Sequence, residues 1–305
     1  MRLLAVISAL GGVASRRELI KRGLSGTQLT AGVRDGVVFR VRQGHYALPD
    51  APRDAVVAVR IGGRVGCLSA LRSYGLWGGL DDEATHVTLP RNASRLRAFR
   101  DDERVAHSDR HHDRDCVLHW DDTHVSGRGP DASSWRVGLE HALVQVTRCA
   151  ARPTIRAAFE SAVVAGSLRL DEAQSLLDAV IAYDERRLVL SERSGSGAES
   201  HLIELLDGLG LRFVQQVVFA GVGRVDFVVE GILVVEVDGY TYHREPAQFD
   251  EDRRRDAAML GRGLPTLRLP ARFVVTQPAL AASRIVDTIT AVRAMRAGSR
   301  PAAVA

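Results

Sequence analysis

The strongest constraint on the fold of this chain is a pair of short apolar segments that carry carboxylates. Residues 223–229 and 232–239 are rich in Val, Ile and Leu, and the Glu-Gly pair between them is a turn signal. We therefore expect a β-hairpin that brings Asp226 beside Glu236 and Asp238. Because side chains alternate along a strand, Glu236 and Asp238 share one face. Carboxylates within apolar strands need a partner, and a divalent cation is a common one.

The region around this hairpin alternates between helix and strand patterns, and Glu199 falls in the first turn of its first predicted helix. The predicted elements are a helix over 198–209, a strand over 212–219, the hairpin, a charged helix over 246–262, a strand over 264–269 and a helix over 279–295. This αβββαβ order predicts a restriction-endonuclease-like α/β domain over residues 195–305. The Ser- and Gly-rich stretch 191–197 is expected to be the linker that precedes it.

Positive charge is concentrated at the N-terminus. Residues 1–50 hold eight Arg or Lys and three Asp or Glu, whereas the whole chain of 305 residues has a net charge of +4. The N-terminal segment therefore carries the entire excess. A small segment with clustered positive charge is typical of a domain that binds the phosphate backbone of nucleic acid.

The N-terminal pattern predicts a winged helix-turn-helix over residues 1–50. Ser15 and Ser25 are N-cap signals for the second and third of three short helices, and a two-stranded hairpin is expected to follow. In such a domain the third helix enters the major groove and the hairpin, or wing, contacts the DNA backbone. The alternative is a domain that only packs against the rest of the chain or binds a protein. The predicted DNA-binding residues are Thr27, Gln28, Thr30 and Arg34 on the third helix, and Arg40 and Arg42 on the wing.

The same segment resembles the N-terminal domain of AbiEi-type antitoxins. The resemblance is carried by Ser15-Arg16-Arg17-Glu18-Leu19, Arg34-Asp35-Gly36 and Gly44-His45-Tyr46. In that family the domain binds operator DNA and regulates the gene of a partner toxin. The resemblance therefore implies DNA as a partner and adds a toxin as a possible second one.

Residues 51–190 are predicted to form a mixed α/β middle domain that ends in helices at 138–149, 153–165 and 171–183. Several histidines gather in its charged stretch among Asp and Arg residues, a composition typical of a solvated loop. We therefore do not predict a metal site there. These histidines are His107, His111, His112, His119 and His124.

Cysteine use and hydropathy exclude several classes of protein. Cys67, Cys116 and Cys149 are widely spaced and form no C-x-x-C pair, so neither a disulfide framework nor a zinc ribbon is expected. This use of cysteine predicts a location in the reducing cytoplasm. No apolar run reaches the roughly 18 residues that span a bilayer, so no membrane partner is expected. With 46% hydrophobic and 26% charged residues, the composition is that of a multidomain α+β globular protein.

The segment from Glu199 to Arg272 resembles the DUF559 family, relatives of the very-short-patch-repair endonucleases in the PD-(D/E)xK superfamily. The resemblance implies that Asp226 and Glu236 bind Mg²⁺ or Mn²⁺, that Glu199 completes the site, and that the reaction is hydrolysis of a phosphodiester. The residues that carry it are Arg224-Val225-Asp226-Phe227, Val235-Glu236-Val237-Asp238-Gly239, His243 and the charged run 249–256.

One position departs from the superfamily pattern, because Asp238 stands where these enzymes place a lysine. An aspartate supplies no positive charge, so we expect His243 or Asp238 to accept the proton from the attacking water and Arg254 to neutralise a phosphate oxygen. The plainer alternatives are carboxylates that face solvent at the end of a sheet, and an arginine run that forms a salt-bridged helix face.

The sequence therefore predicts a DNA-associated, metal-dependent nuclease that is targeted by a winged-helix domain. The alternative function is that of a non-enzymatic transcriptional regulator of AbiEi-antitoxin type, whose C-terminal fold is a structural or protein-binding module. Loss of cleavage on replacement of Asp226 or Glu236 would distinguish the first function from the second.

Overall fold

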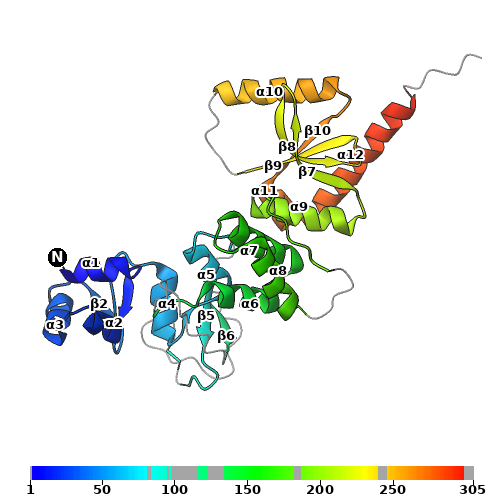
Figure 1. Ribbon diagram of the computed structural model, residues 1–305. Coiled ribbons are helices and arrows are strands. Elements are labelled where there is room, and N and C mark those ends of the chain that lie inside the picture. The colour runs from blue at the N-terminus through cyan, green and yellow to red at the C-terminus, as the bar shows by residue number, and fades with distance from the viewer. Residues whose placement is uncertain are drawn as a thin grey trace, which may run out of the picture. The chain divides into compact units, whose positions relative to one another are not determined.

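The computed structural model describes residues 2–80, 84–94, 96–97, 116–121, 134–181, 187–239 and 246–298, and it gives only the backbone for 246–252. The chain is a multidomain α+β protein that forms two compact units (Figure 1). Unit 1 contains residues 1–150 and 175–184, and unit 2 contains residues 151–174 and 185–305. Unit 2 thus begins earlier in the chain than the predicted C-terminal domain.

Unit 1 begins with three helices and a small antiparallel sheet of strand order β1-β3-β2. Ser15 and Ser25 are the predicted N-caps, and each forms a capping box, Ser15 with Glu18 and Ser25 with Gln28, which fixes the starts of α2 and α3. Strand β1 was not predicted, because three residues are too short to give a periodic signal. The elements are α1 (Arg2–Ala9), β1 (Val13–Ser15), α2 (Arg16–Lys21), α3 (Gly26–Arg34), β2 (Phe39–Arg42) and β3 (His45–Ala47).

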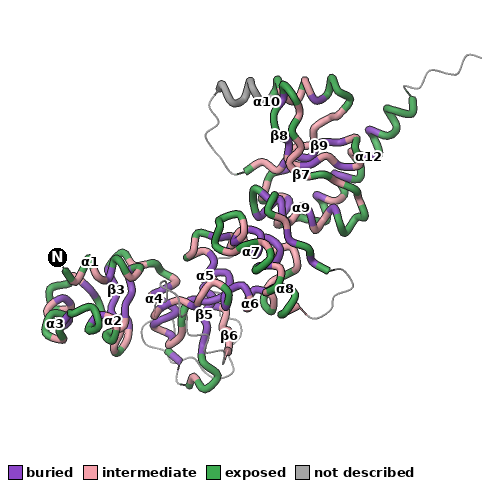
Figure 2. The backbone as a smooth tube through the Cα atoms, in the orientation of Figure 1, coloured by how far each residue is buried: buried purple, intermediate pink, exposed green. Residues whose placement is uncertain are grey.

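The remainder of unit 1 is built around a three-stranded sheet of order β4-β5-β6. Strand β5 is buried along its whole length (Figure 2) and pairs in parallel with β6. Helix α8 (Leu170–Val180) has residues in both units. The elements of this part are α4 (Arg53–Ile61), β4 (Arg64–Val65), α5 (Cys67–Ser73), β5 (Thr85–Leu89), β6 (Cys116–Trp120) and α6 (Leu139–Cys149).

Unit 2 contains the predicted αβββαβ order, preceded by a further helix. Its sheet has the strand order β10-β9-β8-β7, in which β7, β8 and β9 form an antiparallel meander and β10 runs parallel to β9. The elements are α7 (Arg152–Val164), α9 (Gly197–Gly208), β7 (Phe213–Phe219), β8 (Gly223–Val229), β9 (Leu233–Asp238), α10 (Pro246–Gly261), β10 (Thr266–Pro270), α11 (Ala271–Thr276) and α12 (Pro278–Gly298).

Both faces of this sheet are covered by helices (Figure 1). On one face Phe227, Val235 and Leu269 are fully buried in a cluster with residues of α9, α11 and α12. On the other face Val234 packs with Met259 of α10. Alternation along β9 places Val235 in the first core and Glu236 on the α10 side, where Glu236 contacts Arg255 of that helix.

The Ser- and Gly-rich stretch predicted as a linker is irregular but firmly attached. Ser191 and Ser194 donate hydrogen bonds to the buried carboxylate of Glu160 on α7, at 2.9 Å from the Ser191 N–H and 2.7 Å from the Ser194 hydroxyl. Helix α7 therefore packs with the C-terminal sheet domain, in unit 2.

Among the helices that the structure describes, none combines the length and the hydropathy needed to cross a membrane.

Candidate functional site

The predicted hairpin is confirmed. Glu230 and Gly231 both have positive φ, +52° and +66°, as a type I′ turn requires, and the Ile232 N–H donates to the Val229 carbonyl oxygen. The resulting register pairs Phe227 with Val235. One residue further along, Asp226 Oδ2 accepts a hydrogen bond from the Val237 N–H at 2.9 Å, so the aspartate side chain takes the place of a backbone contact beside Glu236.

Glu199 approaches the same place from the first turn of α9. Its side chain is buried and accepts hydrogen bonds at 2.9 Å from the Gly195 N–H and from Gln216 Nε2. Burial raises the pKa of Glu199 and the nearby charge of Asp226 raises it further, whereas these hydrogen bonds oppose the shift. The two carboxylates are therefore close enough to repel each other.

Gln216 is a polar residue of the site that the sequence analysis missed. It lies on β7 between the pairs Gln215–Phe227 and Val217–Val225, which places it opposite Asp226. Its φ of +53° is rare for a residue other than glycine, and such backbone strain is concentrated at functional positions. Its Oε1 atom is buried without a hydrogen-bond partner among the residues that the structure describes. The sequence signal is the Gln-Gln pair that interrupts the apolar strand.

Glu236 is paired with two arginines rather than exposed to solvent. Its Oε2 atom lies 2.7 Å from Arg268 Nη1 of β10, and its Oε1 atom lies 3.3 Å from Arg255 Nη2 of α10. Burial raises the pKa of Glu236, the two arginines act to lower it, and the charge of Asp226 raises it again. The plain alternative of a solvent-facing carboxylate therefore does not describe Glu236.

Arg268 supplies positive charge beside Asp238. Parallel pairing of β10 with β9 places Arg268 directly next to Glu236, and its Nη1 atom also lies 3.3 Å from Asp238 Oδ1. Burial acts to lower the pKa of Arg268, but its hydrogen bond to Asp256 and the charge of Glu236 shift it upward overall. The sequence signal for Arg268 is a charged residue inside an apolar strand. Its partner Glu236 lies thirty-two residues earlier, so the sequence pattern alone does not pair them.

The other two residues predicted for this site have different outcomes. His243 lies outside the described residues. Arg254 is exposed on α10, and its neighbour Arg255 is the arginine that contacts Glu236. Helix phase explains this difference, because adjacent residues of a helix point in directions about 100° apart.

The oxygen atoms of this region are of the type that a hard divalent cation prefers. Carboxylate and amide oxygens are the ligands that Mg²⁺ prefers. Glu199 and Asp226 supply carboxylate oxygens, and Gln216 supplies an Oε1 atom that has no hydrogen-bond partner among the described residues. The negative charges of Glu199 and Asp226 repel each other. Among the described residues, these carboxylate oxygens are not all within 4.8 Å of one another. The side chains that do reach this spacing belong to a different group of four residues, in unit 1. A cation that also binds Glu236 would therefore compete with Arg255 and Arg268.

The predicted DNA-binding residues of α3 are all exposed, but three of them already make local contacts. Gln28 Oε1 accepts from the Ser25 N–H in the capping box, Thr30 Oγ1 donates to the Gly26 carbonyl, and Arg34 Nε lies 2.9 Å from Asp35 Oδ1. Thr27 is exposed on the first turn of the same helix.

The two wing arginines differ. Arg40 is exposed, with its guanidinium 5.9 Å from the centre of the Tyr46 ring. Arg42 is half-buried and packs against the end of α4, and burial together with the charge of Arg97 lowers its pKa. Further exposed basic residues that the sequence analysis did not single out for DNA contact lie on or next to α2, namely Arg16, Arg17, Lys21 and Arg22.

Comparisons with known proteins give a partial match. A family model described as a transcriptional regulator, AbiEi antitoxin, matches residues 1–49. No curated protein matches the chain. Among solved structures, the catalytic domain of the homing endonuclease I-Bth0305I is similar at 18% identity and a TM-score of 0.28, covering 31% of this chain and 95% of that one. The N-terminal segment is therefore similar to the AbiEi antitoxin family of transcriptional regulators.

Proposed function

We propose that this chain is a DNA-binding protein whose C-terminal unit hydrolyses phosphodiester bonds with the help of Mg²⁺ or Mn²⁺. The observation that carries the nuclease part is that Asp226 accepts a hydrogen bond from the Val237 N–H, next to Glu236, while Glu199 is bonded to Gln216, which lies opposite Asp226. The DNA-binding part rests on the antitoxin-family match at residues 1–49 and on the basic, winged-helix-like N-terminal segment.

Each residue of the site would have a distinct role in the reaction. Glu199, Asp226 and Gln216 would hold the cation, with Glu236 as a further ligand once its arginines turn toward the nucleic acid. When bound, the cation polarises the phosphate and lowers the pKa of a water molecule. Arg255 and Arg268 would neutralise the negative charge that develops on the phosphate oxygens. Asp238, beside Arg268, or His243 would accept the proton of the attacking water.

We expect Asp226→Asn to reduce metal-dependent cleavage of labelled DNA by at least about 100-fold, since ligand and outer-shell changes at metal sites have effects of this order. Asparagine keeps an oxygen that accepts the Val237 N–H, so the hairpin is preserved. The measurement is cleavage of duplex, mismatched, nicked and single-stranded substrates with Mg²⁺ or Mn²⁺. The control is Asp287→Asn, an exposed carboxylate on α12 that bonds to Ser283.

Cleavage that survives in Asp226→Asn would remove this site from the reaction. No cleavage by the unmodified protein, with DNA binding intact, would favour the second candidate function, a non-enzymatic regulator of AbiEi type. The specific observation that favours this candidate is that the family match covers residues 1–49 alone.

Both candidate functions require DNA contact through the N-terminal segment. We expect Arg34→Ala/Arg40→Ala to weaken DNA binding and to reduce the slope of log K against log salt by about 2, since each phosphate contact contributes about 0.9. Arg293→Ala on α12, which removes an exposed arginine paired with Glu230, should leave the slope unchanged. Titration of fluorescent duplex DNA at several salt concentrations measures this, and an unaltered slope in the double variant would exclude α3 and the wing as the contact surface.

A further inference from the structure

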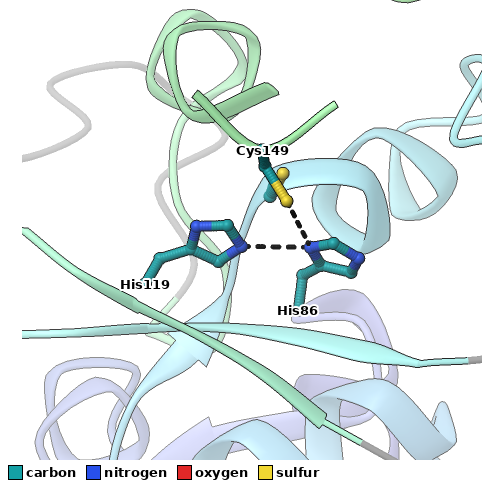
Figure 3. Close-up of side chains that lie close together, drawn as sticks. His86, His119 and Cys149 are labelled. Carbon is teal, nitrogen blue, oxygen red and sulfur yellow. Dashed lines mark hydrogen bonds between the residues drawn. The ribbon is translucent and has the colours of Figure 1, made fainter. Parts of the chain in front are cut away.

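A second cluster of chemically active side chains lies in unit 1, apart from the acidic site. Cys67, His86, His119 and Cys149 each direct one ligand atom to a common place, and these four atoms all lie within 4.8 Å of one another. Figure 3 shows the rings of His86 and His119 and the thiol of Cys149 turned toward one another. Such a set of two sulfur and two nitrogen atoms is the donor set of a tetrahedral zinc site.

Four different elements contribute one ligand each. Cys67 is the first residue of α5, His86 lies on β5, His119 lies on β6 and Cys149 is the last residue of α6. The parallel pairing of β5 with β6 places His119 opposite Thr88, one side-chain repeat beyond His86, so both histidines stand on the same face of the sheet. The cluster therefore connects two strands with the two helices that cover them.

The distances are close to those of a tetrahedral metal centre. His86 Nδ1 lies 3.0 Å from His119 Nε2, and Cys149 Sγ lies 3.8 Å from His86 Nδ1. For zinc bonds of about 2.0 Å to nitrogen and 2.3 Å to sulfur, tetrahedral geometry gives about 3.3 Å between nitrogens and about 3.6 Å between nitrogen and sulfur. For these two pairs, shifts of a few tenths of an ångström reach the tetrahedral distances, and all four ligand atoms lie within 4.8 Å of one another.

Hydrogen bonds alone explain this arrangement poorly. An imidazole nitrogen has either one hydrogen or one lone pair, yet His86 Nδ1 faces both His119 Nε2 and Cys149 Sγ.

Neighbouring residues hold the ligands in position. Gln145, one turn before Cys149 on α6, accepts a hydrogen bond from the Cys67 N–H at 2.9 Å and shares a second one with the Thr88 hydroxyl. The Ser69 hydroxyl accepts from the His86 N–H at 2.9 Å. Cys67 itself has a φ of +47°, a strained value for a residue that begins a helix. Such supporting contacts are characteristic of metal sites in proteins.

We propose that Cys67, His86, His119 and Cys149 bind a structural zinc ion. Four protein ligands fill a tetrahedral shell and leave no open position for substrate, so the ion would stabilise unit 1 rather than catalyse a reaction. The ligand spacing hides this site from the sequence, because no two ligands belong to a C-x-x-C or H-x₃-H pair. His119, which the sequence analysis assigned to a solvated loop, is in strand β6.

The test is the metal content of the full-length protein, prepared without a histidine tag or chelator and analysed by plasma mass spectrometry. We expect about one zinc per chain, and we expect Cys149→Ala and His86→Ala to fall to background. Cys116→Ala is the matched control, since it removes the third cysteine, which is buried at the start of β6 and outside the cluster. His119→Cys should retain zinc, because three cysteines and one histidine also form a common zinc shell.

Substitution of cobalt gives a readout that does not depend on stability. Cobalt(II) in the unmodified protein should show the visible absorption of a tetrahedral ion and a thiolate charge-transfer band, and this band should weaken in Cys149→Ala. Circular dichroism of each variant shows whether it is folded. A folded, unmodified protein without zinc, a Cys67–Cys149 disulfide found by mass spectrometry in reducing-buffer preparations, or full zinc content in Cys149→Ala would each overturn the proposal.

Discussion

Replacing Glu160 with alanine is expected to lower the free energy of unfolding of unit 2 by about 3–5 kcal/mol, the range measured when one partner of a buried ion pair is removed. Glu160 and Arg156 are almost fully buried on α7, with side-chain exposures of 1% and 5%, and lie 3.1 Å apart. The Glu160 carboxylate also accepts hydrogen bonds from the hydroxyls of Ser194 and Ser200. The substitution removes this shared acceptor, although Arg156 Nε keeps its ion pair with Glu204 Oε1 at 2.6 Å.

Urea unfolding followed by circular dichroism measures this effect. Glu172→Ala is the matched control, because it breaks an exposed pair with Arg169 at 3.1 Å, and such surface pairs contribute only about 0–1 kcal/mol. Arg156→Ala/Glu160→Ala should cost less than the sum of the two single changes, since both single changes remove the same ion pair. Strict additivity, or a loss below 1 kcal/mol for Glu160→Ala, would contradict the importance of this network.

The second large effect is a loss of stability in acid that depends on His201. This residue of α9 is mostly buried, which lowers its pKa to about 4, although the nearby charge of Glu204 acts to raise it. In the unfolded chain a histidine has a pKa of about 6.5. Between these values the unfolded state binds a proton that the folded state excludes, so stability falls as the pH decreases from about 6.5 to about 4. The shift corresponds to at most about 3 kcal/mol.

The measurement is the free energy of unfolding at several pH values for the unmodified protein and for His201→Gln. Glutamine does not titrate, so the difference between the two curves isolates His201 from the carboxylates. We expect this difference to stay constant above pH 7 and to change in favour of the variant by about 2 kcal/mol near pH 4.5. Parallel curves over the whole range would show that His201 is protonated equally in both states.

The sequence and the tertiary structure contribute differently to these sites. Local patterns predicted the elements that depend on neighbouring residues, such as the helix N-caps at Ser15 and Ser25 and the hairpin between Asp226 and Glu236. Their signals are short-range, because a cap or a turn is stabilised by residues within about four positions. The αβββαβ order followed from the same local periodicity.

Partners that come from distant elements were not predictable in this way. Arg268 reaches Glu236 only because β10 pairs in parallel with β9, and Gln216 lies opposite Asp226 only because β7 pairs antiparallel with β8 in this register. Helix α7 joined unit 2 through Glu160, although the intervening serine-rich stretch has the composition of a linker. Each of these contacts depends on strand order or helix packing, which the residue pattern does not encode locally.

The sequence by itself therefore determined the strands that carry the acids, the helix starts and the basic N-terminal segment, because these depend on local periodicity, capping and composition. The tertiary structure alone decided which charges meet. It paired Glu236 with Arg255 and Arg268, and it gathered Cys67, His86, His119 and Cys149 from four elements. The physical reason is that burial makes unpaired charges and polar groups costly, so the packed core selects their partners from anywhere in the chain.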